Sequence, residues 1–173
     1  MQKTEIKAAG TGDVQELGML VNSAYRGESS KAGWTTEAHF LDGIRIDIEA
    51  LRELIEMQGS VILTAIEDGK IIGCVNLQKQ GSKLYLGMLT VSPLIQARGI
   101  GKELLKASEV YAVKQLCGSI VMTVISIRSE LIEWYKRRGY NLTGEKKAFP
   151  SDNARLGLPR QNLELAVMEK YLT

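Results

Sequence analysis

Hydrophobic residues in the first third of the chain recur at helical spacing. Asp13 can cap a helix that ends near Gly27, and Asp47 can cap a second one that Gly59 would stop. The apolar positions return every three to four residues, as a single buried face requires. They are Val14, Leu17, Leu20, Val21 and Ala24 in the first stretch and Leu51, Leu54 and Ile55 in the second. The pattern predicts two amphipathic helices separated by an irregular, polar segment at residues 28–46.

The next part of the chain has the composition of strands. Residues 61–66 and 71–77 are rich in β-branched and apolar side chains, and they flank Asp68-Gly69, a pair that suits the positive φ angles of a tight hairpin turn. Residues 84–91 follow as a further antiparallel strand, and residues 4–8 give a weaker strand at the start of the chain. We therefore expect one strand, two helices and then three antiparallel strands.

The second half of the chain mixes helices and strands. Residues 100–116 predict a long helix, and residues 129–138 predict a short one that Gly139 stops. Between them, residues 120–125 form an apolar run, as expected of a strand buried on both faces. Two final strands complete the pattern, at residues 140–143 and 163–168. Since 173 residues is an ordinary length for one domain, the chain predicts a single α/β domain over residues 1–173, with helices packed on a mixed sheet.

Composition places this domain among ordinary globular proteins. Hydrophobic residues make up 45% and charged residues 24%, which excludes disordered and repetitive low-complexity chains. The longest apolar run, residues 120–127, is far shorter than the roughly 18 residues of a membrane span. The first residues lack the apolar core of a secretory signal, so we expect a cytoplasmic protein with no membrane contact. Cys74 and Cys117 each lie in an apolar stretch and are expected to be buried thiols.

The charge is nearly balanced but unevenly distributed. A net charge of +2 gives no strong attraction to nucleic acid. Residues 27–56 hold seven acids and three bases, whereas residues 96–138 hold eight bases and four acids. The basic run Lys136-Arg137-Arg138 is typical of a solvated helix end. His39 is the only histidine, so we expect no His-rich metal site and at most one candidate for Cys-His or Ser-His catalysis, and we expect acid–base chemistry to use mainly carboxylates, tyrosine or water.

Small residues gather where the long helix begins. Ala97, Gly99 and Gly101 leave the main-chain N–H groups of this turn uncovered, so an anion can approach them closely. The helix N-terminus adds a positive dipole end, and Arg98 and Lys102 add charge. The turn therefore predicts a site for a diphosphate or a similar polyanion. The plain alternative is a glycine turn that only starts a helix.

Two nucleotide-binding motifs fail on spacing here. A dinucleotide-binding fingerprint, Gly-x-Gly-x-x-Gly, would need a third glycine at the position of Leu104. It would also have to follow the strand directly, and here the strand ends well before Gly99. A Walker A loop would need Ser or Thr after Lys102, and Glu103 is there instead.

Two motifs of this chain resemble those of the GCN5-related N-acetyltransferases (GNATs). The first is Gln96-Ala97-Arg98-Gly99-Ile100-Gly101, which is similar to the family's Gln/Arg-x-x-Gly-x-Gly/Ala turn. The segment before it, Leu89-Thr90-Val91-Ser92-Pro93, resembles the end of the family's fourth strand. The second is Tyr135-Lys136-Arg137-Arg138-Gly139-Tyr140, similar to the family's Tyr-x-Lys/Arg-x-Gly-Phe/Tyr helix end. The resemblance implies a GNAT-like fold, with a mostly antiparallel sheet, helices on both faces, and fourth and fifth strands (84–91 and 120–125) that splay apart.

The resemblance also implies a coenzyme site. Main-chain N–H groups in the glycine turn would hold the coenzyme A diphosphate, and the preceding strand end would pair with the pantetheine arm. Arg128 stands where the family often has Asn, and it could meet a carbonyl or a phosphate. The implied coenzyme-binding residues are Leu89, Thr90, Val91, Gln96, Ala97, Arg98, Gly99, Ile100, Gly101, Lys102 and Arg128.

Tyr135 matches the family's tyrosine that protonates the departing thiolate. A phenol with a pKa near 10 is a plausible acid for a thiolate whose conjugate acid has a pKa near 8.5. The alternative is an aromatic residue that only packs its helix on the sheet.

The acceptor side rests on weaker signals. An amine must lose its proton before it attacks, and Glu37 is our first choice of base, with His39 and Asp42 behind it, although all three could be solvated loop charges. By resemblance, their segment borders the acceptor pocket, which Tyr25, Trp34 and Thr36 could wall. The acidic segment favours a cationic amine. Arg155 and Arg160, in contrast, could pair a carboxylate and favour an amino-acid-like acceptor.

The most specific hypothesis is an acetyl-CoA-dependent N-acetyltransferase that acts on a small-molecule or peptide amine by direct transfer in a ternary complex. The alternative is a non-catalytic, coenzyme A-binding regulatory module of the same fold, which Arg128 and the lack of a strand-borne acid would suit. No nucleic-acid partner is expected, and a homodimer stays open.

Overall fold

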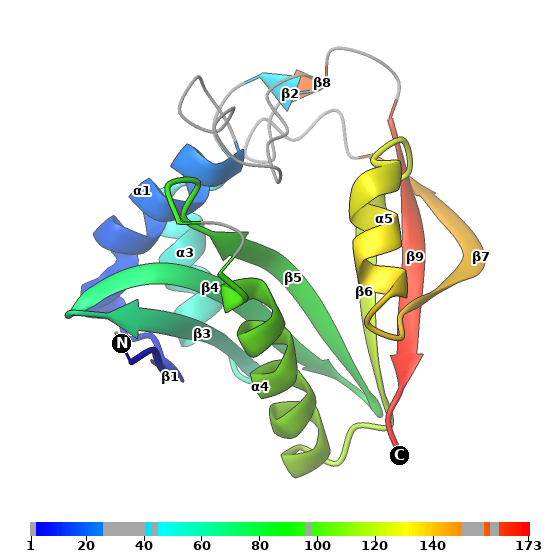
Figure 1. The fold of residues 1–173 in the computed structure, drawn as a ribbon, viewed down its shortest axis with the longest axis horizontal. Coiled ribbons are helices and arrows are strands. Elements are labelled where there is room, and N and C mark those ends of the chain that lie inside the picture. Colours follow the sequence, from blue (N-terminus) through cyan, green and yellow to red (C-terminus); the bar gives the residue numbers. More distant parts are fainter. Residues whose placement is uncertain (1–2, 26–40, 43–44, 96–97, 150–157, 160–162) are drawn as a thin grey trace.

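The computed structural model describes residues 3–25, 41–42, 45–95, 98–149, 158–159 and 163–173. Its main sheet has seven strands in the order β1-β3-β4-β5-β6-β9-β7 (Figure 1). All neighbouring pairs are antiparallel except β5 and β6, which are parallel. The strands are β1 (Glu5–Ala8), β3 (Ser60–Glu67), β4 (Lys70–Gln80), β5 (Lys83–Val91), β6 (Ser119–Ile125), β7 (Asn141–Ala148) and β9 (Glu164–Tyr171).

Helices cover both faces of this sheet, as the sequence predicts. One hydrophobic cluster joins α1 and α3 to the sheet, and a second joins α4 and α5 to its other face (Figure 1). The Asp47 carboxylate accepts a hydrogen bond from the N–H of Ala50 and caps α3 as expected. Asp13 instead ends a short 3-10 helix and accepts from the N–H of Gly10. The helices are η1 (Thr11–Asp13), α1 (Val14–Tyr25), α3 (Ile48–Glu56), α4 (Ile100–Lys114) and α5 (Ser129–Lys136).

The tight turn between β3 and β4 is confirmed. Asp68 and Gly69 have φ angles of 50° and 76°, the positive values that a type I′ turn needs at both central positions. Glu67 and Lys70 pair across it. This local signal fixes the register of the hairpin from which the rest of the antiparallel half is built.

β5 and β6, the fourth and fifth strands of the main sheet, part soon after they meet. Their pairing extends only from Lys83, opposite Ser119, to Tyr85, opposite Val121, and beyond it the strands diverge (Figure 1). At the closed end, Glu169 of β9 accepts hydrogen bonds from the Ser119 hydroxyl at 2.6 Å and from the Lys83 ammonium at 3.1 Å. This carboxylate therefore joins three strands at the base of the splay.

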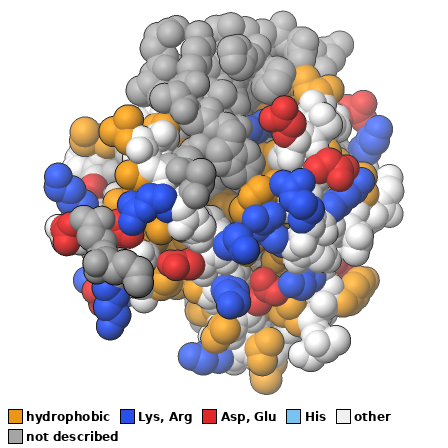
Figure 2. Space-filling view, viewed as in Figure 1, with side chains coloured by type: hydrophobic (Ala, Val, Ile, Leu, Met, Phe, Trp, Pro, Cys, Tyr) orange, Lys and Arg blue, Asp and Glu red, His pale blue; other side chains and the backbone are white. Residues whose placement is uncertain are grey.

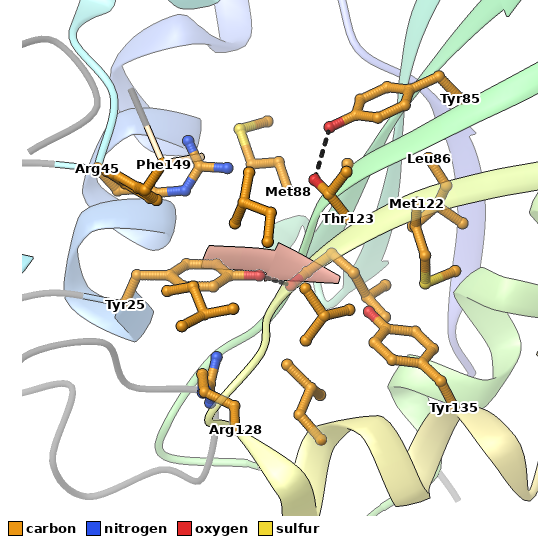
Figure 3. Close-up of a pocket in the computed structure, with 16 residues that line it drawn as sticks. Tyr25, Arg45, Tyr85, Leu86, Met88, Met122, Thr123, Arg128, Tyr135 and Phe149 are labelled. Atoms are coloured by element: carbon orange, nitrogen blue, oxygen red, sulfur yellow. Dashed lines mark hydrogen bonds between the residues drawn. The ribbon is translucent and has the colours of Figure 1, made fainter. Parts of the chain in front are cut away.

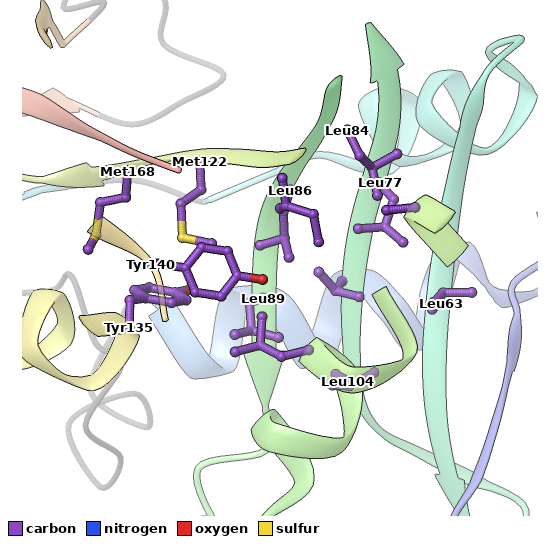
Figure 4. Packing of buried hydrophobic residues seen from close by; sticks show 14 of the residues in the cluster. Leu63, Leu77, Leu84, Leu86, Leu89, Leu104, Met122, Tyr135, Tyr140 and Met168 are labelled. Carbon is purple, nitrogen blue, oxygen red and sulfur yellow. The ribbon is translucent and has the colours of Figure 1, made fainter. Parts of the chain in front are cut away.

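The core between α4, α5 and the sheet lies directly beside the splay. Tyr135 and Tyr140 pack edge to face, with ring centroids 5.9 Å apart, and Figure 4 shows them together with Leu86, Leu89 and Met122. Tyr140 is fully buried. Since aromatic pairs of this geometry stabilise packing beyond their buried area, the pair fixes α5 against the diverging strands.

The last strands differ from the sequence pattern in length. β7 extends past the predicted end at residue 143 because it pairs with the first half of β9. β9 extends past residue 168 because its last residues pair with β6, and both pairings satisfy backbone groups that the local pattern leaves unassigned. A second, two-stranded sheet was not predicted. It joins β2 (Leu41–Asp42) to β8 (Leu158–Pro159), so the segments before α3 and before β9 meet. Within the described residues, no helix has the length and apolar character needed to cross a bilayer.

Candidate active site

A β-bulge marks the point where β5 leaves β6. Met88 has a φ angle of +57°, and Met88 and Leu89 together lie opposite a single residue of β4, Val75. An extra residue interrupts the ladder and redirects backbone groups away from the neighbouring strand. The bulge therefore places main-chain polar groups of β5 beside the splay rather than in the sheet.

A cavity of about 300 Å³ lies between the diverging strands (Figure 3). Its polar side chains include Tyr25, Tyr85, Thr123 and Tyr135, and most of the remaining wall is apolar. The Tyr85 hydroxyl lies 3.5 Å from the Thr123 hydroxyl, so the two strands are bridged just beyond their last paired residues. The volume and the mixed lining suit the reacting part of a ligand rather than a solvent channel.

Tyr25 closes one wall of this cavity from the end of α1. Its ring is buried, and its hydroxyl donates a hydrogen bond to the main-chain carbonyl of Leu89 in the bulge (Figure 3). Tyr25 thus lies where the sequence places it, at the pocket, but its hydroxyl is engaged by the strand. It holds the bulge in position.

Tyr135 enters the same cavity from α5, on the opposite side. The residue is buried, and its ring meets Trp134 edge to face with centroids 5.1 Å apart. Burial raises the pKa of the Tyr135 hydroxyl well above its ordinary value, while the positive charge of Arg128 acts weakly in the other direction. The hydroxyl is therefore protonated at neutral pH and is able to donate a hydrogen bond or a proton.

The start of α4 is open above and tightly packed below. Gly99 caps the helix with a φ angle of +81°, and a Cβ there would meet no atom of the described residues within 4 Å. Beneath it, a Cβ on Gly73 of β4 would lie 2.9 Å from the Thr90 carbonyl oxygen and 3.2 Å from the Ile100 side chain. The first turn thus sits directly on the sheet, and Gly99 adds no side chain to it, which fits the anion cradle that the sequence predicts.

The basic residues of this turn have different surroundings. Arg98 Nη2 lies 3.0 Å from the buried carboxylate of Glu67, whereas Lys102 is exposed. Figure 2 shows Lys and Arg side chains gathered over the region of α4 and α5. Trp134 lies beside the same turn, 3.4 Å from where a Cβ on Gly101 would be. The surface around the cradle is therefore positive, but the Arg98 side chain is already paired.

Two arginines line the cavity itself. Arg128, a predicted coenzyme contact, is the N-cap residue of α5. Arg45, which the sequence did not single out, reaches the cavity from the segment before α3. Its main-chain N–H donates to the Asn22 side chain at 2.6 Å, and this long-range contact has no signature in the hydrophobic pattern.

Several predicted residues lie outside the described part of the chain. They include the base candidates Glu37 and His39, the pocket residues Trp34 and Thr36, the turn residues Gln96 and Ala97, and the arginines Arg155 and Arg160. The roles assigned to them stay predictions. Leu89, Thr90 and Val91 lie at the end of β5, between the bulge and the glycine turn, where a pantetheine arm would have to pass.

Comparisons with known proteins agree with this geometry. Residues 23–150 match the family model described as "Acetyltransferase (GNAT) domain". The fold is similar to PaiA N-acetyltransferase from Thermoplasma acidophilum in complex with coenzyme A, with a TM-score of 0.71, 19% identity, and 98% of this chain and 99% of that chain covered. It is also similar to the ribosomal-protein-S18-alanine N-acetyltransferase from Escherichia coli, with a TM-score of 0.74, 13% identity, and 99% and 95% of the two chains covered.

A third similar structure is YncA from Salmonella typhimurium, a putative acetyltransferase with its cofactor acetyl-CoA, at a TM-score of 0.69 and 18% identity over 99% of this chain and 95% of that one. By sequence, the chain matches none of the curated proteins. The splayed sheet and the glycine-led helix define an acyl-CoA-dependent transferase class. The chain belongs to the GNAT acetyltransferase family.

Proposed function

We propose that this protein transfers the acetyl group of acetyl-CoA to a primary amine by direct attack in a ternary complex. The observation that carries the proposal is the cavity between β5 and β6, which holds the buried Tyr135 hydroxyl and opens where the two strands part. A thioester in this cavity could be reached by an amine and would have a hydrogen-bond donor beside its sulfur.

The donor half of the site would use main-chain groups. The diphosphate of acetyl-CoA would bind over the first turn of α4, where Gly99 leaves open space and the helix dipole is positive. The pantetheine arm would follow Leu89 to Val91 as an added strand, because these residues lead from the turn to the cavity. Lys102 and the neighbouring basic surface would attract the polyanion over a longer range.

The chemistry then needs two proton movements. A neutral amine attacks the thioester carbonyl, a C–N bond forms, and the C–S bond breaks when the tetrahedral intermediate collapses. The amine nitrogen gives up a proton to a base, for which Glu37 is the candidate, and the thiolate takes a proton from Tyr135, which regains one from solvent. Burial keeps the Tyr135 hydroxyl protonated, so a hydrogen-bond donor is available beside the sulfur.

The proposal is tested by incubating the protein with acetyl-CoA and a panel of amines while the release of free thiol is followed. Amine-dependent release of thiol, with the acetylated amine found by mass spectrometry, supports it. Coenzyme binding in calorimetry without thiol release for any amine overturns the catalytic assignment and leaves the alternative, a coenzyme-binding regulatory module.

A matched pair of variants tests the coenzyme cradle. Gly99→Asp puts a side chain and a negative charge over the turn, and it should abolish coenzyme binding. Gly81→Asp is the control, because Gly81 also has a positive φ angle, +64°, with open space around it, but lies in the turn between β4 and β5. Equal coenzyme affinity in the two variants would contradict diphosphate binding at this turn.

A further inference from the structure

The charged side chains that line the cavity between β5 and β6, among the described residues, are all positive. Among the described residues that line it, Arg45 and Arg128 are the charged ones, and neither Asp nor Glu is present. Figure 3 shows the two arginines with the Tyr25 ring between them in this view. Two guanidinium groups in a low-dielectric cavity repel an ammonium-rich ligand and attract an anionic group.

Arg45 is held in place by contacts with α1. The Asn22 side chain accepts hydrogen bonds from the N–H groups of Arg45 at 2.6 Å and Ile46 at 3.1 Å, and it donates one to the Ile46 carbonyl at 2.9 Å. The Arg45 guanidinium lies over the ring of Tyr25, 5.6 Å from its centroid. An arginine with its backbone fixed and its side chain stacked loses less freedom when it binds a ligand.

Arg45 also stands where two cavities meet. A second cavity of about 270 Å³ lies on the face of the sheet that α3 covers, and its lining includes Asn76 and Gln78 of β4. It shares Arg45, Tyr85, Gly87 and Met88 with the first cavity. Glu53 of α3, an exposed residue, lines this second cavity but not the first. Arg45 therefore lines both the reacting cavity and the cavity beside it.

We propose that the acceptor is an amine that carries an anionic group a few bonds from its nitrogen, with the carboxylate of an amino acid as the committed case. This inference rests on the proposed function. The Arg45 guanidinium binds the carboxylate through paired N–H···O hydrogen bonds, and Arg128 adds positive potential to the same cavity. The two cations also lower the pKa of the acceptor ammonium, so more of it is in the neutral form that attacks.

Matched acceptors provide the first test. Phenylalanine, phenylalaninamide and phenethylamine share a side chain and differ at the carboxylate, as do leucine, leucinamide and isopentylamine; spermidine represents the polycations. We expect kcat/KM for the amino acids to exceed that for their carboxylate-free partners by about 10- to 100-fold, the range that a charged hydrogen-bonded pair provides. Equal or greater kcat/KM for the decarboxylated amines or for spermidine would overturn the inference.

Variants of Arg45 locate the effect. Arg45→Gln should raise KM for the amino acid about 10- to 100-fold, with a much smaller effect on the matched carboxylate-free amine and no change in KM for acetyl-CoA, and Arg45→Lys should restore part of the loss. Arg52→Gln is the control, because Arg52 is an exposed residue of α3 outside both cavities. A loss of kcat/KM that is the same for acceptors with and without a carboxylate would contradict carboxylate recognition by Arg45.

Binding separates this inference from the proposed function. Calorimetry with the coenzyme A complex measures amino-acid affinity without any transfer. Saturable binding of phenylalanine or leucine, weaker for the amide and for the Arg45→Gln variant, supports the inference even if no thiol is released, in which case only the proposed catalysis fails. Transfer to amines that is indifferent to the carboxylate overturns the inference alone. Neither binding nor transfer across the panel overturns both.

Discussion

The Arg98 guanidinium lies 3.0 Å from the carboxylate of Glu67, across the gap between the glycine turn and the end of β3. Glu67 is 6% exposed and also accepts a hydrogen bond from the Thr4 hydroxyl at 2.7 Å. The sequence places Arg98 on the diphosphate, but its side chain is used within the protein. Its role is then to fix the turn whose N–H groups would bind the ligand.

Removal of Arg98 should therefore act on stability and on coenzyme affinity together. Arg98→Ala leaves a nearly buried carboxylate without its cation and should lower the free energy of unfolding by about 1–2 kcal/mol, a range reduced because Arg98 itself is partly exposed. We expect the Kd for coenzyme A to rise without a change in kcat. A double-mutant cycle with Glu67→Gln, measured by urea unfolding and calorimetry, should show strong coupling; additive effects would mean that the pair does not position the turn.

Gly73 tests how closely α4 must approach the sheet. Because its Cβ would lie 2.9 Å from the Thr90 carbonyl oxygen of β5 and 3.1 Å from the Leu104 side chain, Gly73→Ala must shift the end of β5 and press on the side chains with which α4 packs on the sheet. We expect a loss of about 1–3 kcal/mol in unfolding free energy and weaker coenzyme binding in calorimetry. Gly118→Ala is the control, since a Cβ there meets nothing within 4 Å. Unchanged coenzyme affinity in Gly73→Ala would show that the packing of α4 on the sheet does not control coenzyme binding.

Tyr135→Phe removes the hydroxyl that we assign to the leaving thiolate. The expected result is a fall in kcat of about 100-fold with coenzyme affinity preserved, measured by steady-state kinetics and calorimetry. Tyr140→Phe is the matched control, because Tyr140 packs against Tyr135 and its buried hydroxyl has no hydrogen-bond partner among the described residues. Equal kcat for the Tyr135→Phe variant and the wild-type protein would exclude the hydroxyl from the reaction.

The raised pKa of Tyr135 gives a separate prediction about pH. Since burial keeps the phenol protonated above its ordinary pKa near 10, the acid form persists as pH rises through the neutral and moderately alkaline range. The kcat profile should therefore show no alkaline limb from this residue below about pH 10. A limb centred below pH 9 in the wild-type protein, absent from its Tyr135→Phe variant, would contradict the raised pKa of Tyr135.

Glu169 makes the base of the splay sensitive to acid. Burial alone would raise the pKa of this carboxyl, but hydrogen bonds from Ser119 and Lys83 outweigh it and hold the pKa below the ordinary value of 4.5. A depressed folded-state pKa stabilises the fold above the unfolded pKa, and this stabilisation is lost as pH falls through the folded value. We expect Glu169→Gln to lower the urea midpoint at pH 7 and the difference from wild type to close as pH falls below 4.5 and through the lowered pKa of Glu169. A difference in urea midpoint that stays constant with pH would contradict this role of the Glu169 carboxylate.

The sequence predicts those features that short segments encode by themselves. Asp68-Gly69 requires a tight turn because of its φ preferences, and Gly99 marks the start of α4 because little else fits a φ angle of +81° at that cap. The family fold follows from the glycine turn and from the helix that ends after Tyr135, and the structure and the family model confirm it.

Other features depend on contacts between distant segments. The bulge at Met88 is a mismatch between two strands, and neither strand shows it alone. The hydrogen bond from the Arg45 N–H to the Asn22 side chain joins α1 to a segment whose sequence pattern is only irregular and polar. The pattern therefore could not place Arg45 at the cavity. The pairing of Arg98 with Glu67 likewise brings together residues 31 positions apart, which the local charge pattern does not reveal.

The most direct test is a crystal structure of the protein with coenzyme A. We expect the diphosphate within about 3.5 Å of main-chain N–H groups at the start of α4, and the thiol in the cavity between β5 and β6 beside the Tyr135 hydroxyl. A coenzyme bound elsewhere, or a thiol that points away from Tyr135, would contradict acetyl transfer at this site.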